Sequence, residues 1–311
     1  MAAGQSVVIV GYASLDSSSS MREFRGVDAT SILERAIVSV EPGIGGIAHL
    51  AIAVSAAGGP VDAISWVGND DGGRAWIQAV AAQGSGTEGV VMAGTRTPSA
   101  TLIEIGSGGT ICFFDPGDCH SDHLTAKQVE VITSSDWVLL TVAPRSITTQ
   151  LLDVLPAAAR LVWAVKHDED AYTDAMVRRI LQRADIVSFS RGERSYLTVD
   201  GVAPESMMRP GSLAIETRGA DGVAWCFAGA GGAGRHGALA VDRVDVNDTT
   251  GAGDTFVGTL VGLVSAHMPF ETLSDEEVTT LVATASSAVG DLLRRRMDSG
   301  PSAGALQKEI H

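Results

Sequence analysis

A short glycine-rich stretch towards the end of the chain contains the residue types best suited to chemistry. Its residues are Asp248, Thr249, Thr250, Gly251, Ala252, Gly253 and Asp254. Small residues let the backbone turn tightly and bring successive amides close to an anion. The apolar run 256–264 that follows predicts a buried helix. The N-terminus of such a helix offers unpaired N–H donors and a partial positive charge, which suit phosphate.

Asp254 would lie in the first turn of that helix, beside the phosphate. A site that only binds phosphate has no use for a carboxylate there, because the two charges repel. Phosphoryl transfer to a hydroxyl does use one, because a group must orient the hydroxyl and accept its proton. The alternative is an ordinary glycine-rich helix start, with Asp254 stabilising the helix dipole.

This stretch closely resembles the second signature of the ribokinase-like (PfkB) family of carbohydrate kinases, Asp-Thr-x-Gly-Ala-Gly-Asp. The resemblance implies that Asp254 is the catalytic base for transfer from ATP. It also implies an anion hole for the γ-phosphate, formed by the amides of Gly251, Ala252, Gly253 and Asp254. Thr250 would lie beside the nucleotide. As in some relatives, Asp248 would help to bind a monovalent cation.

The family also carries a Gly-x-x-x-x-Asp motif after its first strand, which Gly11 and Asp16 match. The resemblance implies that Asp16 binds substrate hydroxyls, with Ser14 beside it. A carboxylate suits a diol because it accepts two hydrogen bonds. The alternative is an aspartate that caps a turn after a strand.

The family's first signature is a Gly-Gly pair followed by an asparagine that contacts the sugar. Gly45 and Gly46 match the pair, and the resemblance implies that they hold the substrate. His49 or Leu50 stands where the asparagine is expected, and Ser14 also departs from the ribokinase pattern. Ribose itself is therefore not favoured as the substrate.

Two further motifs are implied to contact the nucleotide. Glu193 matches the glutamate of the family's Asn-x-x-Glu motif, which is linked to Mg²⁺ through water, while Ser190 replaces the asparagine. The alternative for Glu193 is a solvated residue in the first turn of a helix. The second motif, Thr-x-Gly-x-x-Gly, is matched by Thr217, Gly219 and Gly222.

Alternating apolar segments predict strands and helices in turn. Strands are expected at 7–11, 61–67, 89–93, 137–142, 161–165, 185–189, 213–217, 222–228 and 238–244. Helices are expected at 45–57, 71–82, 147–155, 170–182, 256–264 and 276–296. Such alternation predicts a mostly parallel sheet covered on both faces. The small residues Gly258 and Gly262 predict close packing of their helix on the sheet.

The fold class expected from this pattern and from the resemblance is a ribokinase-like three-layer α/β/α architecture with a small β lid. The lid would come from two insertions, about 14–44 and 97–115, the second containing a hairpin of 101–105 and 110–114. Both would belong to a single domain covering residues 1–311.

Composition excludes several classes of function. The formal charge is -15, from 22 Lys+Arg against 37 Asp+Glu, which argues against nucleic-acid binding. No apolar stretch is long enough to cross a membrane. Three cysteines are too few for a disulfide framework and favour a reducing, cytoplasmic location.

Two other motifs are set aside. The run 229–234 satisfies a dinucleotide-binding pattern, but no helix is expected after it, so it is interpreted as a flexible loop. The segment 119–123 contains cysteine and histidines, but it has no second cluster with the spacing of a zinc site.

The sequence therefore predicts an ATP-dependent kinase that uses Mg²⁺ and acts on a sugar or sugar derivative. A nucleoside is the second candidate for the substrate, with Tyr12, Phe24 or Phe114 available to stack on a base. A relative that binds nucleotide or sugar without catalysis is a third possibility. An exposed lid strand would favour a homodimer through the lid.

Overall fold

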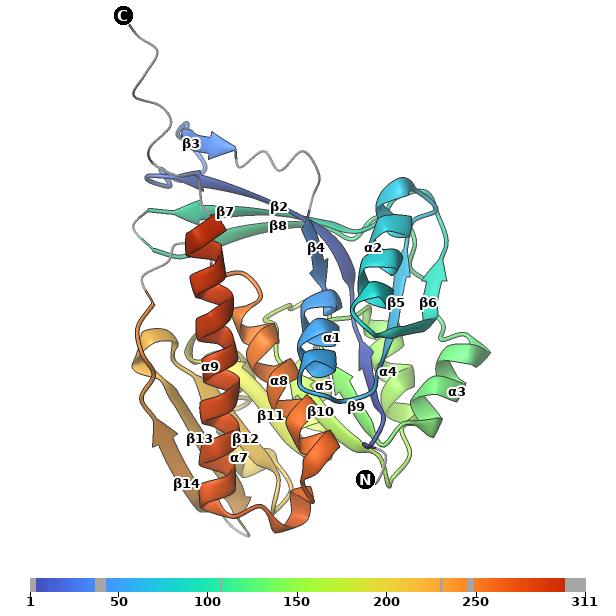
Figure 1. The fold of residues 1–311 in the computed structure, drawn as a ribbon, viewed down its shortest axis with the longest axis vertical. Helices are drawn as coiled ribbons and strands as arrows, with labels where there is room; N and C mark the ends of the chain where they lie inside the picture. Colours follow the sequence, from blue (N-terminus) through green and yellow to red (C-terminus); the bar gives the residue numbers. More distant parts are fainter. Residues whose placement is uncertain (1–3, 37–42, 107, 230–231, 245–248, 300–311) are drawn as a thin grey trace, which may run out of the picture.

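The computed structural model describes residues 4–36, 43–106, 108–229, 232–244 and 249–299, which form two β-sheets with helices around them (Figure 1). The larger sheet has nine strands in the order β14-β13-β12-β11-β10-β9-β1-β5-β6. Their bounds are β1 Val7–Val10, β5 Val61–Val67, β6 Gly86–Met92, β9 Trp137–Leu140, β10 Arg160–Ala164, β11 Ile186–Ser190, β12 Leu213–Thr217, β13 Val223–Gly229 and β14 Gly232–Leu239.

The larger sheet is parallel from β12 to β6, and β13 and β14 extend it in antiparallel pairing. Strands β1 and β9 each consist of four buried apolar residues. A strand that is apolar on both sides needs cover on both faces of its sheet, which parallel sheets obtain from two layers of helices.

Helices cover both faces, and alternate side chains of β1 enter two separate cores. Val7 and Ile9 pack with α1, α2, α8 and α9, whereas Val8 and Val10 pack with α3, α4 and α5. The predicted three-layer α/β/α architecture is therefore confirmed. The helices are α1 Ile47–Ala56, α2 Asp71–Ala82, α3 Ala126–Ser134, α4 Arg145–Val154, α5 Asp174–Arg183, α6 Arg194–Leu197, α7 Pro204–Met207, α8 Ala252–His267 and α9 Asp275–Ser299, with short 3-10 turns η1 Arg191–Glu193, η2 Gly219–Asp221 and η3 Phe270–Thr272.

Helix α8 packs closely on α1, which corrects the expected packing of its glycines on the sheet. A Cβ at Gly258 would lie 2.7 Å from the Cβ of Ala53, and one at Gly262 would lie 2.7 Å from the Cβ of Ala57. Two glycines four residues apart make one flat strip along a helix. The strip lies against α1 because both helices cover the same face of the sheet.

A smaller sheet lies across one end of the larger one (Figure 1). Its strands are β2 Ala13–Met21, β3 Leu33–Ala36, β4 Gly43–Gly46, β7 Ser99–Ile105 and β8 Thr110–Asp115. Their order is β3-β2-β7-β8, with β4 also paired to β2. β7 and β8 form the predicted antiparallel hairpin, and β7 runs parallel to β2. Strands from both expected insertions therefore meet in one sheet.

Residues 230 and 231 of the expected loop at 229–234 lie outside the described residues, but the rest of that loop and the expected strand at 238–244 are wrong. β14 begins at Gly232, inside the glycine-rich run, and ends at Leu239. Glycines are needed where β14 lies close to its antiparallel partner β13. A Cβ at Gly237 would lie 2.5 Å from the ring of Trp225, and one at Gly234 would lie 2.3 Å from the carbonyl oxygen of Phe227.

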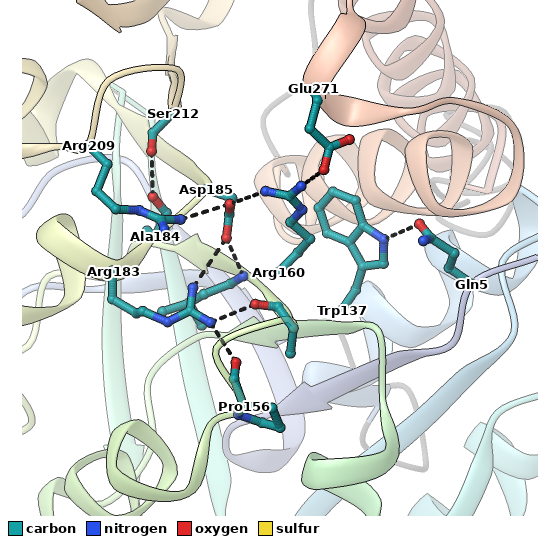
Figure 2. Close-up of polar contacts among 12 residues, drawn as sticks. Gln5, Trp137, Pro156, Arg160, Arg183, Ala184, Asp185, Arg209, Ser212 and Glu271 are labelled. Carbon is teal, nitrogen blue, oxygen red and sulfur yellow. Dashed lines mark hydrogen bonds and ion pairs between the residues drawn. The ribbon is translucent and has the colours of Figure 1, made fainter. Parts of the chain in front are cut away.

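A cluster of arginines joins the amino ends of β10, β11 and β12 around one buried carboxylate (Figure 2). Asp185 is 3% exposed, and its Oδ1 accepts hydrogen bonds from Arg160 at 2.7 Å and Arg209 at 2.8 Å. Arg183 lies 3.4 Å from its Oδ2. Arg160 also pairs with Glu271 in η3, so the cluster ties the connection between α8 and α9 to the sheet.

Two simpler findings concern membranes and cysteines. Within the described ranges, no helix combines the length and the apolar character needed to cross a membrane. Cys112, Cys119 and Cys226 carry free thiols.

We predict that Asp185→Ala lowers the free energy of unfolding by about 3–5 kcal/mol, because it leaves three arginines without their shared carboxylate. Asp153→Ala is the matched control, since Asp153 forms an exposed ion pair with Arg179 at 2.6 Å. That pair should contribute less than about 1 kcal/mol. Urea unfolding measures both values, and equal losses would contradict a stabilising role for the cluster.

Candidate active site

The carboxyl ends of the parallel strands meet the N-terminus of α8. Residues just after β1, β9 and β10 line one cavity of about 520 Å³ there, which we call cavity A. Ligands in open α/β sheets bind outside the carboxyl ends of the strands. The lining residues of cavity A are Tyr12, Ser14, Asp16, Gly46, His49, Ala100, Leu102, Thr110, Cys112, Phe114, Thr141, Val142, Lys166, His167, Asp168, Thr249, Thr250, Gly251, Gly253 and Asp254.

The first turn of α8 faces this cavity without a side-chain cap. Gly251 is the N-cap residue in the left-handed conformation, with a φ of 72°. A side chain there would be strained, and its Cβ would lie 3.1 Å from the ring of His49. Nothing lies within 4 Å of the place where a Cβ on Gly253 would be. Ala252 N already donates to the carbonyl oxygen of Thr249 at 3.1 Å, whereas the amides of Gly253 and Asp254 have no such bond within the described residues and are available to an anion.

Asp254 is 9% exposed and forms an ion pair with Lys166. The distance from Lys166 Nζ to Asp254 Oδ1 is 3.0 Å. The negative charge of Asp254 raises the pKa of the Lys166 ammonium above its usual range. Asp254 lies in the first turn of α8, as the sequence predicted. The ion pair with Lys166 was not predicted.

Asp16, in β2, is a half-buried lining residue of cavity A. Ser14 Oγ donates a hydrogen bond to Asp16 Oδ1 at 2.6 Å. Burial is the main cause that raises the pKa of the Asp16 carboxyl, and the nearby charge of Asp254 adds to it. Desolvation of this kind disfavours the ionised form, which a hydrogen-bonding ligand would offset.

The predicted glycine pair has two distinct positions. Gly46 lines cavity A with a φ of 62°, and a Cβ there would lie 2.1 Å from the carbonyl oxygen of Tyr12. Gly45 is not among the lining residues. A Cβ on Gly45 would lie 2.1 Å from Asp16 Oδ2, so this glycine makes room for the carboxylate. Of His49 and Leu50, either of which could stand at the position of the family's asparagine, His49 lines the cavity, whereas Leu50 is fully buried and does not.

A second cavity of about 510 Å³, cavity B, lies on the other side of the α8 N-terminus. Thr217, Gly219 and Gly222 line it together with Ala252 and Gly253. Thr249 and Gly253 line both A and B. Of the remaining expected nucleotide contacts, Thr250 lines cavity A, and Asp248 lies outside the described residues.

The turn that forms one wall of cavity B is held by backbone and side-chain contacts. Arg218 N donates to the carbonyl oxygen of Gly222 at 2.8 Å. Gly222 has a φ of 91°, and a Cβ there would lie 2.0 Å from the carbonyl oxygen of Leu239. Glu216 is buried and accepts hydrogen bonds from Arg194 at 3.0 Å and Arg218 at 2.8 Å.

A third cavity of about 210 Å³, cavity C, joins the other two. Glu193 and Lys166 line it with Thr217, Gly253 and Asp254. The Glu193 carboxylate accepts hydrogen bonds from Ser190 N at 2.7 Å and Ser190 Oγ at 2.8 Å. Ser190 therefore fixes the orientation of Glu193 where the family has an asparagine.

Within the described residues, no three His, Cys, Asp or Glu side chains lie close enough to hold a metal ion. Glu193 and Asp254 are the carboxylates among the described residues that line cavity C, and Asp254 is paired with Lys166. Such a site suits Mg²⁺, which keeps several waters and takes most of its other ligands from phosphates.

Sequence reasoning missed Thr141 and Lys166. Thr141 is 4% exposed, and its Oγ1 is buried at cavity A without a hydrogen-bond partner. Thr141 lies within the strand predicted at 137–142 and directly follows the observed β9, whereas Lys166 comes directly after the strand predicted at 161–165. A polar residue at the carboxyl end of a buried parallel strand was the available signal.

Comparisons with known proteins agree on the fold and the family. The model of the pfkB family carbohydrate kinases matches residues 5–289. Among curated proteins, no sequence matches the chain significantly.

Three solved structures illustrate the structural likeness. The Arabidopsis thaliana ribokinase complexed with ribose and ATP has a TM-score of 0.70 at 18% identity, and the match covers 94% of this chain and 99% of that one. The Xylella fastidiosa fructokinase with bound ATP gives the same four values. So does the Cryptococcus neoformans ribokinase in complex with ADP. At identities this low, the likeness establishes the fold.

We predict that replacing two aspartates, Asp16 and Asp118, changes the free energy of unfolding with opposite pH dependences. The pKa of Asp16 in the folded state is raised above its ordinary 3.8. Ionisation of Asp16 therefore lowers the free energy of unfolding as the pH rises from the unfolded-state pKa through the folded-state pKa. The free energy of unfolding of Asp16→Asn, relative to that of the wild type, should therefore increase from about pH 3 to 7. Hydrogen bonds from Thr95 and Arg96 lower the pKa of Asp118 to about 2. The free energy of unfolding of Asp118→Asn, relative to that of the wild type, should therefore decrease from about pH 2 to 4. The same trend in both variants would contradict the opposite pKa shifts of the two carboxyls.

We also predict that Gly45→Ala destabilises the protein and displaces Asp16. The added methyl group overlaps the carboxylate, so the free energy of unfolding should fall by about 1–3 kcal/mol. Gly43→Ala is the control from the same strand, since the nearest atom to its Cβ would be 3.8 Å away. The control should stay within about 0.5 kcal/mol of the wild type in urea unfolding. Similar losses in both variants would rule out the overlap as the cause.

Proposed function

The chain belongs to the pfkB family of carbohydrate kinases, phosphotransferases with an alcohol group as acceptor, and we propose that it transfers the γ-phosphate of ATP to a hydroxyl of a small sugar or sugar derivative. One observation carries the proposal. Cavities A, B and C converge on Gly253 at the N-terminus of α8, and Asp254 lines two of them. A donor and an acceptor entering from different sides would meet at that turn.

The acceptor side is cavity A. Asp16 and Ser14 present a carboxylate and a hydroxyl, which suit the hydroxyl groups of a sugar. Thr141 Oγ1 is buried and unpartnered at the same cavity, and a substrate hydroxyl would satisfy it. His49 replaces the family's sugar-binding asparagine there, which argues for a substrate other than ribose.

The donor side is cavity B, where Thr217, Gly219 and Gly222 would hold the nucleotide. ATP bound in the similar Arabidopsis and Xylella structures supports ATP as the donor. The γ-phosphate would lie against the amides of Gly251, Ala252, Gly253 and Asp254. Thr250 would lie beside it, and Asp248 would assist with a monovalent cation.

The transfer step follows from this arrangement. The acceptor oxygen forms a bond to the γ-phosphorus while the bond to the bridging oxygen of ADP breaks. The hydroxyl proton passes to the Asp254 carboxylate, which later returns it to solvent. The preorganised amides stabilise the charge on the transferring phosphoryl group. Mg²⁺ arriving with ATP would neutralise phosphate charge, with Glu193 contacting its waters.

The smaller sheet would act as a lid. Ala100 and Leu102 of β7 and Cys112 and Phe114 of β8 line cavity A, so this sheet covers the acceptor site. Excluding water protects the phosphoryl group from hydrolysis. β8 is an edge strand on which Phe113 is 58% exposed, which supports pairing with a second lid in a homodimer.

An aromatic wall supports a nucleoside as the second candidate for the acceptor. The rings of Tyr12 and Phe114 lie 5.1 Å apart at cavity A. Behind Tyr12, the ring of His120 is neutral because burial lowers its pKa to about 4. A planar base could stack on this wall while Asp16 binds the ribose. Phe24, also considered for stacking, does not line the cavity.

We predict that Asp254→Asn lowers kcat by about 100-fold to 10,000-fold, because the amide cannot accept the proton. ADP release is measured across a panel of sugars, sugar acids and nucleosides. Asp275→Asn is the matched control, since Asp275 lies in the first turn of α9 and pairs with Arg235 at 2.7 Å, away from the three cavities. It should keep wild-type turnover.

Two results would count against this function. Full activity of Asp254→Asn on a substrate of the wild type would remove Asp254 as the base. Binding of ATP and a panel compound by the wild type without any turnover would identify a non-catalytic relative.

A further inference from the structure

The reaction centre concentrates negative charge before any nucleotide arrives. The carboxylates at cavities A and C belong to Asp16, Asp168, Glu193 and Asp254. Asp254 already raises the pKa of Asp16, so their charges interact across cavity A. A triphosphate whose tip lies at the α8 amides would add more negative charge beside Asp254. Backbone dipoles alone supply only a partial positive charge there.

Lys166 is the cation placed between these groups. Among the described residues that line cavities A and C, it is the only lysine or arginine, and it lines both. It follows the end of β10, so its backbone is fixed at the edge of the sheet. Its side chain is 45% exposed, against 12% for that of Asp254. Lys166 is thus the more exposed member of the pair, and its long, flexible side chain has more rotatable bonds than that of Asp254.

The ion pair also conflicts with the proposed role of Asp254. The Oδ1 atom of Asp254 is held by the Lys166 ammonium at 3.0 Å, so this oxygen is not free to accept a hydrogen bond from an attacking hydroxyl. Asp254 raises the pKa of Lys166, and the charge of Glu193 contributes, so the lysine stays protonated. For Oδ1 of Asp254 to receive the hydroxyl proton, the pair has to open. A stronger anion beside Lys166 would open it.

We propose that Lys166 is a second catalytic residue, whose ammonium pairs with Asp254 in the free enzyme and moves to the γ-phosphoryl group when ATP binds. This rests on the proposed function. Lys166 keeps its three protons throughout, while the hydroxyl proton goes to Asp254 and ADP leaves. The movement offsets the charge on the transferring group and frees Asp254 in the same step.

The test compares two nucleotides that differ in the γ-phosphate. Calorimetry measures the binding of ADP and of β,γ-methylene ATP, with Mg²⁺ and without sugar, to the wild type, Lys166→Met and Lys166→Arg. Lys127→Met is the control, since Lys127 forms exposed ion pairs with Glu88 at 2.8 Å and Glu130 at 3.5 Å. Far-UV circular dichroism and thermal unfolding check that each variant is folded.

We expect Lys166→Met to bind the ATP analogue about tenfold or more weakly, with ADP affinity changed less than about threefold. Lys166→Arg should retain most of the analogue's affinity, because it keeps the charge. On a substrate that the wild type phosphorylates, kcat of Lys166→Met should fall about 100-fold to 1,000-fold. Lys127→Met should match the wild type in every measurement.

Other outcomes would overturn the proposal. Equal effects on ADP and the analogue, or no effect on either, would mean that Lys166 does not contact the γ-phosphoryl group. If Lys166→Met raised only the KM for the sugar and left kcat and nucleotide binding unchanged, Lys166 would instead bind an acidic substituent of the substrate. The binding measurements need no turnover, so selective loss of the analogue in a chain that phosphorylates nothing would reject the proposed function and keep the γ-phosphate contact.

Discussion

The contact between α1 and α8 decides where a site can form in this protein. Gly258 and Gly262 let the two helices touch along their length, and Gly251 meets the ring of His49 at their N-termini. Because both helices start at the carboxyl edge of the sheet, this contact fixes the open amides of α8 relative to Gly46. Asp16, which packs over Gly45, is fixed with them. The spacing of acid and amides is thus a consequence of helix packing.

The two edges of the larger sheet use charge in opposite ways. At the amino edge, Asp185 is buried but satisfied by surrounding arginines and by the amide of Leu161, so it ties strands together. At the carboxyl edge, Thr141 Oγ1 lacks a partner, and the smaller sheet brings there Asp16, whose carboxyl is desolvated. Groups left unsatisfied cost stability unless a ligand binds. The ion pairs at the amino edge of the sheet thus stabilise a protein whose carboxyl edge keeps polar groups available for a ligand.

Sequence patterns predicted the elements whose signals are local. β5, α2 and β12 have the bounds expected for them, because each is an uninterrupted pattern with clear ends, such as Asp70 capping α2. α3 was not predicted, although Thr125 and Gln128 form a capping box at its start. The strand that begins at Gly232 could not be found, because its glycines are explained only by their close contacts with Trp225 and Phe227 on the neighbouring strand β13. Likewise, Lys166 meets Asp254 only through the strand order of the sheet.

The departures from the family's motifs have local structural consequences. Ser190 stands where an asparagine is expected, and its backbone amide and hydroxyl both donate to Glu193, so the glutamate is still oriented towards cavity C. His49 replaces a second asparagine, and its ring contacts the site of Gly251 while lining cavity A. One side chain therefore lies against both cavity A and the first turn of α8. Under the proposed function, a substrate in cavity A that moves His49 would also act on Gly251, at the turn that would hold the γ-phosphate.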